Sequence, residues 1–181
     1  MPTPIGHTLA GALICSRRPF DWRLFLATLF VANFPDVDFA FGFAVGDPNR
    51  YHHGFTHSFV FVLLATAAGS WFYTRKRPNR FTFVYAIFAS AGISHLILDV
   101  LALDTSAPYG CPLLWPFTNE YFISPIILFS DVHRISDTRH FFPSLLNPHN
   151  ARTVLLEIVL LTPLLVVVML KNRWTRGEKS N

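Results

Sequence analysis

Long apolar stretches separated by short polar segments dominate this chain. Four of the stretches approach the length of a membrane span: residues 24–45, 56–73, 81–103 and 153–170. A helix rises about 1.5 Å per residue, so it needs about 20 residues to cross the hydrocarbon core of a bilayer. A shorter apolar run, residues 5–15, predicts an N-terminal helix packed against the first span. The pattern therefore predicts an all-α, polytopic membrane helical bundle with about four transmembrane helices.

The composition favours a bilayer setting for this bundle. Hydrophobic residues make up 51% of the 181 positions, charged residues only 14%, and Phe occurs 19 times. An ordinary soluble domain has about 25% charged residues. We therefore expect one membrane-embedded domain covering residues 1–181. The only cysteines, Cys15 and Cys111, lack the CxxC spacing of a thiolate zinc site.

The basic residues gather at the ends of the apolar runs. They form three clusters: Arg17, Arg18 and Arg23; Arg75, Lys76, Arg77 and Arg80; and Lys171, Arg173, Arg176 and Lys179. Cytoplasmic loops carry an excess of Lys and Arg, and placing all three clusters there gives four consistent crossings. Residues 104–150 then form an extracytoplasmic cap of loops and short helices. Despite the net charge of +4, this distribution argues against nucleic-acid binding.

Ionisable residues inside the apolar runs carry the candidate chemistry. A charge at bilayer depth costs several kcal/mol, so it usually has a partner and a function. His95 and Asp99 are four residues apart and share one helical face. The other candidates are His7 in the first apolar run, Asp36 and Asp38 after Pro35, and His57 at the start of the second span.

Helical rise places five of these residues at a similar depth. His7, Asp36, His57, His95 and Asp99 lie roughly 15–28 Å from the nearest basic cluster. They come from four separate segments, and we expect them to meet toward the extracytoplasmic side. Imidazole and carboxylate ligands without thiolate suit zinc, with manganese and iron as alternatives. A bridging carboxylate would allow the two-metal arrangement that many hydrolases use.

Two features of this set stay open at the level of sequence. His53 and His57 have the i,i+4 spacing of a helical ligand pair, but Gly54 favours a loop from which His52 reaches inward. The whole cluster also has two non-enzymatic interpretations. It could fix helix packing in a non-catalytic membrane scaffold, or it could line the path of a metal-ion transporter.

The order of these motifs resembles that of the YdjM-type inner-membrane, metal-dependent hydrolases. The resemblance rests on His7 with Gly11, on Pro35-Asp36-Val37-Asp38, on the segment from His52 to Ser58, and on the His95/Asp99 pair. It covers about residues 1–120, and it includes Leu114-Trp115-Pro116-Phe117. The resemblance assigns His52 as the first histidine of its motif, and His53 replaces an arginine of the family pattern.

The YdjM-type family is in turn similar to the zinc-dependent phospholipase C and P1 nuclease group. This similarity implies a metal centre held by His7, Asp36, Asp38, His52, His57, His95 and Asp99. It implies hydrolysis of a phosphate ester, of a lipid or a related substrate, by a metal-activated water, with Asp36 or Asp38 as the catalytic carboxylate. The expected location is the bacterial inner membrane, with membrane lipids as partners. Arg134, Arg139 and His133 are candidates for contact with a headgroup.

Overall fold

The regular elements of the protein are helices. The computed structural model describes residues 1–16 and 21–177, and within them only two isolated β-bridges occur. The helices are α1 (Pro4–Cys15), α2 (Trp22–Ala32), α3 (Asp38–Ala44), α4 (Phe59–Thr74), α5 (Phe81–Val100), α6 (Phe141–Leu145) and α7 (Pro148–Gly177). Three 3₁₀ helices join them: η1 (Phe34–Val37), η2 (Phe55–His57) and η3 (Pro78–Arg80). The predicted all-α class is confirmed.

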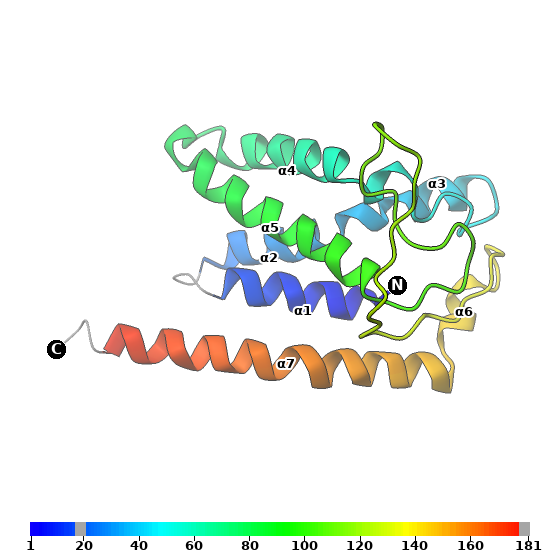
Figure 1. Ribbon diagram of the computed structural model, residues 1–181. Coiled ribbons are helices and arrows are strands. Elements are labelled where there is room, and N and C mark those ends of the chain that lie inside the picture. The colour runs from blue at the N-terminus through cyan, green and yellow to red at the C-terminus, as the bar shows by residue number, and fades with distance from the viewer. Residues whose placement is uncertain (17–20, 178–181) are drawn as a thin grey trace.

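Helix α5 lies at the centre of the bundle. It packs against α1, α2 and α4, while α7 packs along the outer side of α1 (Figure 1). The turn between α4 and α5 lies at one end of the molecule, and the N-terminus and the irregular residues 101–140 lie at the other. This end, which also carries α3 and α6, is where the candidate site is built.

Only some of the predicted spans are long, continuous helices in the described residues. Pro78–Val100 and Pro148–Asn172 are long and apolar enough to cross a membrane. The first predicted span is broken into α2 and the η1–α3 segment, which meet at a bend of 61°. Pro35 lies at this bend and lacks the N–H that a continuous helix would need. Helix α4 has 16 residues, fewer than a straight span, so the structure supports two spans, or three with the bent pair.

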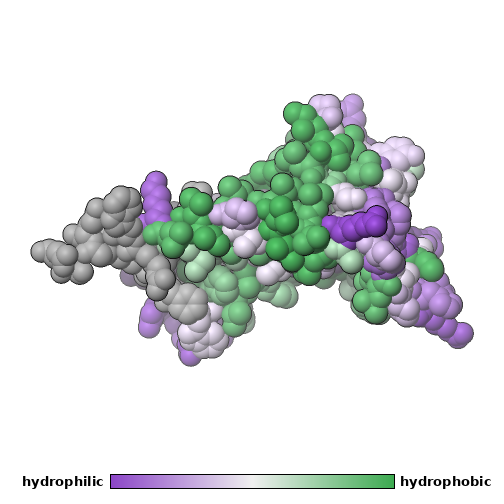
Figure 2. Space-filling model, turned by 90° about the horizontal axis from the view of Figure 1, so that it is seen from below, coloured by the Kyte–Doolittle hydropathy of each residue, from purple (hydrophilic) through white to green (hydrophobic). Residues whose placement is uncertain are grey.

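The surface of the bundle carries a broad apolar region. Along α7 only 17% of the candidate span is buried, and Leu155, Val159 and Val167 are among its exposed side chains. Figure 2 shows this region as a hydrophobic area over the middle of the molecule, with hydrophilic residues toward its ends. An apolar surface of this extent matches a helix in contact with lipid. Of the predicted basic clusters, Arg17, Arg18 and Lys179 lie outside the described residues.

Close packing of α4 on α5 depends on Gly92. A Cβ atom at this position would lie 2.6 Å from Cγ1 of Val62, whose side chain is buried. We expect Gly92→Ala to destabilise the protein by about 1–3 kcal/mol, because the backbone must move to relieve the clash. Thermal unfolding in detergent measures the effect. Gly69→Ala is the matched control, since its Cβ would meet Phe88 at 3.9 Å, and equal melting temperatures for the two variants would contradict the prediction.

Candidate metal centre

Four separate segments bring histidine and aspartate side chains together at the irregular end of the bundle. Helix α5 supplies His95 and Asp99 on one face, and α1 supplies His7. The break after α2 places Asp36 in η1 and Asp38 at the start of α3. The segment before α4 supplies the remaining histidines, which are His52, His53 and His57. All the predicted site residues thus lie in one cluster.

The deepest group consists of His7, His95 and Asp99. The side chains of all three are fully buried, and Nε2 of His7 lies 3.5 Å from Oδ1 of Asp99. Nε2 of His95 lies 3.0 Å from Oδ2 of the same carboxylate. The two imidazole rings stack with their centroids 3.8 Å apart. One ligand atom from each residue lies within 4.8 Å of the others, so this group could hold a metal ion.

A second group lies beside the first and shares one histidine with it. Oδ1 of Asp36 lies 3.5 Å from Nε2 of His57 and 3.6 Å from Nε2 of His95. The two imidazole nitrogens are 3.2 Å apart. Two nitrogens and one carboxylate oxygen directed at a common point are the donors that zinc takes in catalytic sites. Asp36, His57 and His95 therefore form a second candidate metal position.

A third group, His52, His53 and His57, lies toward the surface. His53 has φ of 57°, the left-handed conformation, which is uncommon for a residue other than glycine. The rings of His52 and His53 lie with their centroids 4.2 Å apart. Two adjacent residues thus direct imidazoles toward His57. Both histidines that the sequence offered as alternatives, His52 and His53, thus belong to the cluster.

The Nδ1 atoms of four of these histidines contact an oxygen outside the candidate ligand groups. Nδ1 of His95 donates to the carbonyl oxygen of Ala32 at 2.8 Å. Nδ1 of His52 lies 3.2 Å and Nδ1 of His57 lies 3.1 Å from Asp38, and Nδ1 of His53 lies 3.3 Å from Asp104. Such contacts fix the ring and leave Nε2 free to bind, which is the usual support of a metal-ligating histidine.

Asp36 and Asp38 have different surroundings although they are two residues apart. Both oxygens of Asp36 are buried without a hydrogen-bond partner. Asp38 instead contacts His52 and His57 and accepts a hydrogen bond from Thr56 at 3.0 Å. The geometry gives Asp36 the character of a ligand and Asp38 that of a residue that orients two histidines.

The cluster contains many buried polar atoms without a hydrogen-bond partner. Such atoms are few in folded proteins, and each one costs about 1–3 kcal/mol. Here they include both ring nitrogens of His7, both oxygens of Asp36 and of Asp99, and Nε2 of His52 and of His53. Divalent metal ions would satisfy these lone pairs and offset the buried negative charge. The residues present therefore fit a metal centre.

Two residues outside the predicted set support the outer part of the cluster. Asp104 accepts from the backbone N–H groups of Ser106 and Gly110 and contacts His53. Burial raises the pKa of Asp104, but these contacts lower it further and hold the carboxyl well below its usual range. Burial also lowers the pKa of His52 to about 3, so its ring is neutral, as a metal ligand must be. The second residue, Cys111, lies close to His53 and Asp99.

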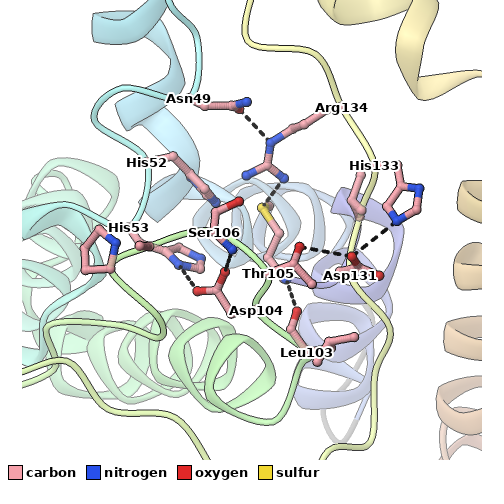
Figure 3. A pocket seen from close by; sticks show the side chains of 14 residues that line it. Asn49, His52, His53, Leu103, Asp104, Thr105, Ser106, Asp131, His133 and Arg134 are labelled. Carbon is pink, nitrogen blue, oxygen red and sulfur yellow. Dashed lines mark hydrogen bonds and ion pairs between the residues drawn. The ribbon is translucent and has the colours of Figure 1, made fainter.

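Two cavities meet the cluster at His52 and His53. A polar cavity of about 270 Å³ is lined by Asp104, Ser106 and Arg134 together with these histidines (Figure 3). A larger groove of about 650 Å³ lies along Phe41, Val45, Phe55 and Tyr121 and is mainly apolar. The candidate metal centre thus borders a polar and an apolar binding space.

The predicted headgroup contacts have different positions. Arg134 and His133 line the polar cavity, whereas Arg139 is exposed on the surface. His133 belongs to a separate group with Asp131 and His149, in which the two imidazole rings stack at 3.7 Å. Asp131 lies 3.0 Å from Nε2 of His149 and 3.4 Å from Nε2 of His133. This outer group is more exposed than the main cluster.

Comparisons with known proteins agree with the membrane character of the helices. Residues 1–175 match the family described as YdjM inner membrane protein. The chain is 30% identical over 131 residues to the inner membrane protein YbcI of Escherichia coli strain K12, covering 69% of this chain and 73% of that protein. No solved structure matches the chain.

Proposed function

The chain belongs to the YdjM inner membrane protein family, and from this premise we propose that it is a membrane-embedded, metal-dependent hydrolase of phosphate esters. The observation that carries the proposal is the set of buried, unpartnered donor atoms on His7, Asp36 and Asp99. Zinc is the metal that best suits a site of imidazole and carboxylate ligands, with manganese and iron as alternatives. Bound metal ions would polarise phosphoryl oxygens and lower the pKa of water.

The side chains of the cluster would have different roles in such a reaction. His7, His95 and Asp99 would hold one metal ion, and Asp36 and His57 a second one. The two oxygens of Asp99 face different histidines, 3.5 Å from His7 and 3.0 Å from His95, which suits a bridging carboxylate. Asp36, whose Oδ1 lies 3.5 Å from Nε2 of His57 and 3.9 Å from Nδ1 of His52, would accept the proton of the attacking water. Asp38 would keep His52 and His57 in position.

The surroundings of the cluster favour an amphiphilic substrate. The apolar groove along Phe41, Val45 and Phe55 begins at His52 and His53, and these three side chains are among the exposed hydrophobic residues. A hydrocarbon chain in this groove would place its phosphate beside the metal centre. Phospholipids and isoprenoid phosphates have this chemistry. The centre lies at the end opposite the basic α4–α5 turn (Figure 1), so the extracytoplasmic side is the proposed location of the reaction.

Two observations weigh against the rival functions. A transporter needs a polar path that continues beyond the cluster, and the polar residues available on α4 are Thr66, Ser70 and Thr74. Each donates its hydroxyl to the carbonyl oxygen four residues earlier in the same helix, and α4 contains no His, Asp or Glu that could continue a path for a metal ion. A packing scaffold needs satisfied polar groups, whereas the carboxylate oxygens of Asp36 and Asp99 are buried without a hydrogen-bond partner.

The proposal is tested on the full chain purified in detergent. The protein is loaded with zinc or manganese and incubated with phosphatidic acid, phosphatidylglycerol or an isoprenoid diphosphate in mixed micelles. Metal-dependent release of the hydrolysed product, abolished by a chelator and restored by metal, is the expected result. Stoichiometric metal without hydrolysis of any phosphate ester would favour transport, and no metal after loading would leave only the packing role.

The orienting role of Asp38 leads to a separate prediction. Asp38→Asn keeps the shape of the side chain but weakens its contacts to the Nδ1 atoms of His52 and His57. Loss of such supporting contacts typically lowers metal affinity 10–100-fold, and we expect a decrease in that range. Competition with a fluorescent zinc chelator measures the affinity. The matched control is Asp137→Asn, because Asp137 is exposed and pairs with the exposed His140 outside the cluster. An Asp38→Asn variant with wild-type affinity would refute the role.

A further inference from the structure

Arg134 lies in the wall of the polar cavity, across from the histidines that border the metal centre. Figure 3 shows its guanidinium directed into the space that His52, His53 and Asp104 also line. The residue comes from the irregular segment after α5, so its position depends on that segment folding back over the site. Its side chain is half-buried.

The contacts of this guanidinium are to neutral groups. Nε donates to Oδ1 of Asn49 at 2.7 Å, and Nη1 donates to Sδ of Met1 at 2.9 Å. The guanidinium also lies over the ring of Phe39, 5.1 Å from its centroid. Within the described part of the chain, no carboxylate lies within salt-bridge distance of Arg134.

The half-buried Arg134 cation has neutral hydrogen-bond partners and no carboxylate in direct contact among the described residues. Burial lowers the pKa of Arg134, yet an arginine remains protonated in proteins. Asp36, Asp104, Asp38 and Asp99 attract its charge from beyond salt-bridge distance, and each of them lies 3.0–3.5 Å from a histidine instead. Desolvating a charge without an anionic partner is costly, so the arrangement indicates that an anion from outside the protein completes it.

The shape of the site indicates the class of this anion. A guanidinium presents its N–H groups as a planar fork that matches two oxygens of a phosphate. Two of its donors are fixed by Asn49 and Met1, which holds the remaining donors toward the cavity. The cavity volume of about 270 Å³ accommodates a phosphate group with a small substituent.

We propose that Arg134 binds the anionic phosphate group of the substrate in the polar cavity, beside the metal centre. This inference rests on the proposed function, since it assigns a substrate-binding residue to the same site. The phosphate of a lipid headgroup and inorganic phosphate share the chemistry that Arg134 recognises. Arg134 would therefore determine affinity for phosphate-bearing ligands, whereas the histidines and carboxylates hold the metal.

The test measures binding of two probes to the full chain in detergent, each in the metal-free and the zinc-loaded form. Inorganic phosphate is followed by ³¹P relaxation, and phosphatidic acid in mixed micelles by displacement of a fluorescent analogue. Arg134→Gln removes the charge, and Arg134→Lys keeps it without the fork. Arg139→Gln is the matched control, because Arg139 is exposed on the same segment. Zinc content and the melting temperature of each variant verify that the metal centre and the fold persist.

We expect Arg134→Gln to weaken binding by about tenfold or more, the value of a charge-assisted contact, with a smaller loss for Arg134→Lys and none for Arg139→Gln. If Arg134→Gln weakens binding of both probes, the result supports a general phosphate subsite. If it weakens binding of phosphatidic acid alone, the result supports a subsite specific for a lipid headgroup. Wild-type affinity of Arg134→Gln for both probes, or no binding by the wild type, overturns the inference. A different outcome is that the protein binds no zinc but still binds phosphate through Arg134. That result would overturn the proposed metal hydrolase and support the anion subsite.

Discussion

A His95→Ala variant is expected to lose its bound zinc. Nε2 of His95 lies 3.0 Å from Asp99, 3.2 Å from His57 and 3.6 Å from Asp36, so it is common to the two deepest candidate metal groups. Removing this nitrogen takes one ligand from each group at once. We expect a decrease in zinc affinity of at least about 100-fold, the upper end of what loss of a supporting contact alone causes.

Elemental analysis of the purified protein, followed by chelator competition, checks this expectation. His140→Ala is the matched control, because His140 is exposed and contacts Asp137 outside the cluster. A His149→Ala variant measures any metal held by the outer group with Asp131 and His133. Zinc that remains at the wild-type content in His95→Ala but decreases in His149→Ala would place the metal in the outer group and contradict the proposed centre.

Replacing Asp36 with asparagine is expected to have the largest effect on hydrolysis. Asp36 contributes two buried oxygens without partners, and one of them lies within 3.6 Å of both His57 and His95. An amide keeps the size of the side chain but loses the negative charge and cannot take a proton from water. The loss of a few kcal/mol of transition-state stabilisation corresponds to about a 10³-fold decrease in kcat/KM.

The assay is performed at saturating zinc, so that weaker metal binding does not account for the loss. The control is Asp104→Asn, which changes a carboxylate that supports His53 but lies outside the two deep groups. We expect a smaller decrease for this variant. Equal activities of Asp36→Asn and wild type at saturating zinc would show that Asp36 takes no part in the reaction.

Local sequence patterns predicted some parts of the structure well. The apolar run 81–103 corresponds to α5, and the run 153–170 lies inside α7. His95 and Asp99 share a face because their spacing equals about one helical turn, which depends on nothing beyond α5 itself. The first predicted span is not one continuous helix in the structure, because the helix breaks at Pro35, which lacks a backbone N–H. Hydropathy does not detect this loss of a hydrogen-bond donor.

The contacts between distant segments could not be derived from the pattern in the same way. The contact of His7 with Asp99 depends on how α1 packs against α5. The position of α1 also depends on its close approach to α2, where a Cβ atom at Gly11 would lie 2.9 Å from Cβ of Ala32. The part played by His53 depends on a single left-handed φ angle. Its partner Asp104 lies on the segment that the sequence assigned to a loop, and loops carry no periodicity that predicts contact. The depth estimated from helical rise predicted that these residues lie in one layer of the membrane. It could not predict which of them form each candidate metal group.

His95 belongs to both deep groups, and this limits how many metal ions the centre can bind with equivalent ligands. The Nδ1 proton of His95 is committed to Ala32, so only the lone pair on Nε2 is available, and one lone pair serves one ion. The set with His7 and Asp99 and the set with Asp36 and His57 therefore compete for it. A centre with both positions filled would be asymmetric, because His95 would supply its imidazole to one position only and leave the other with fewer protein ligands.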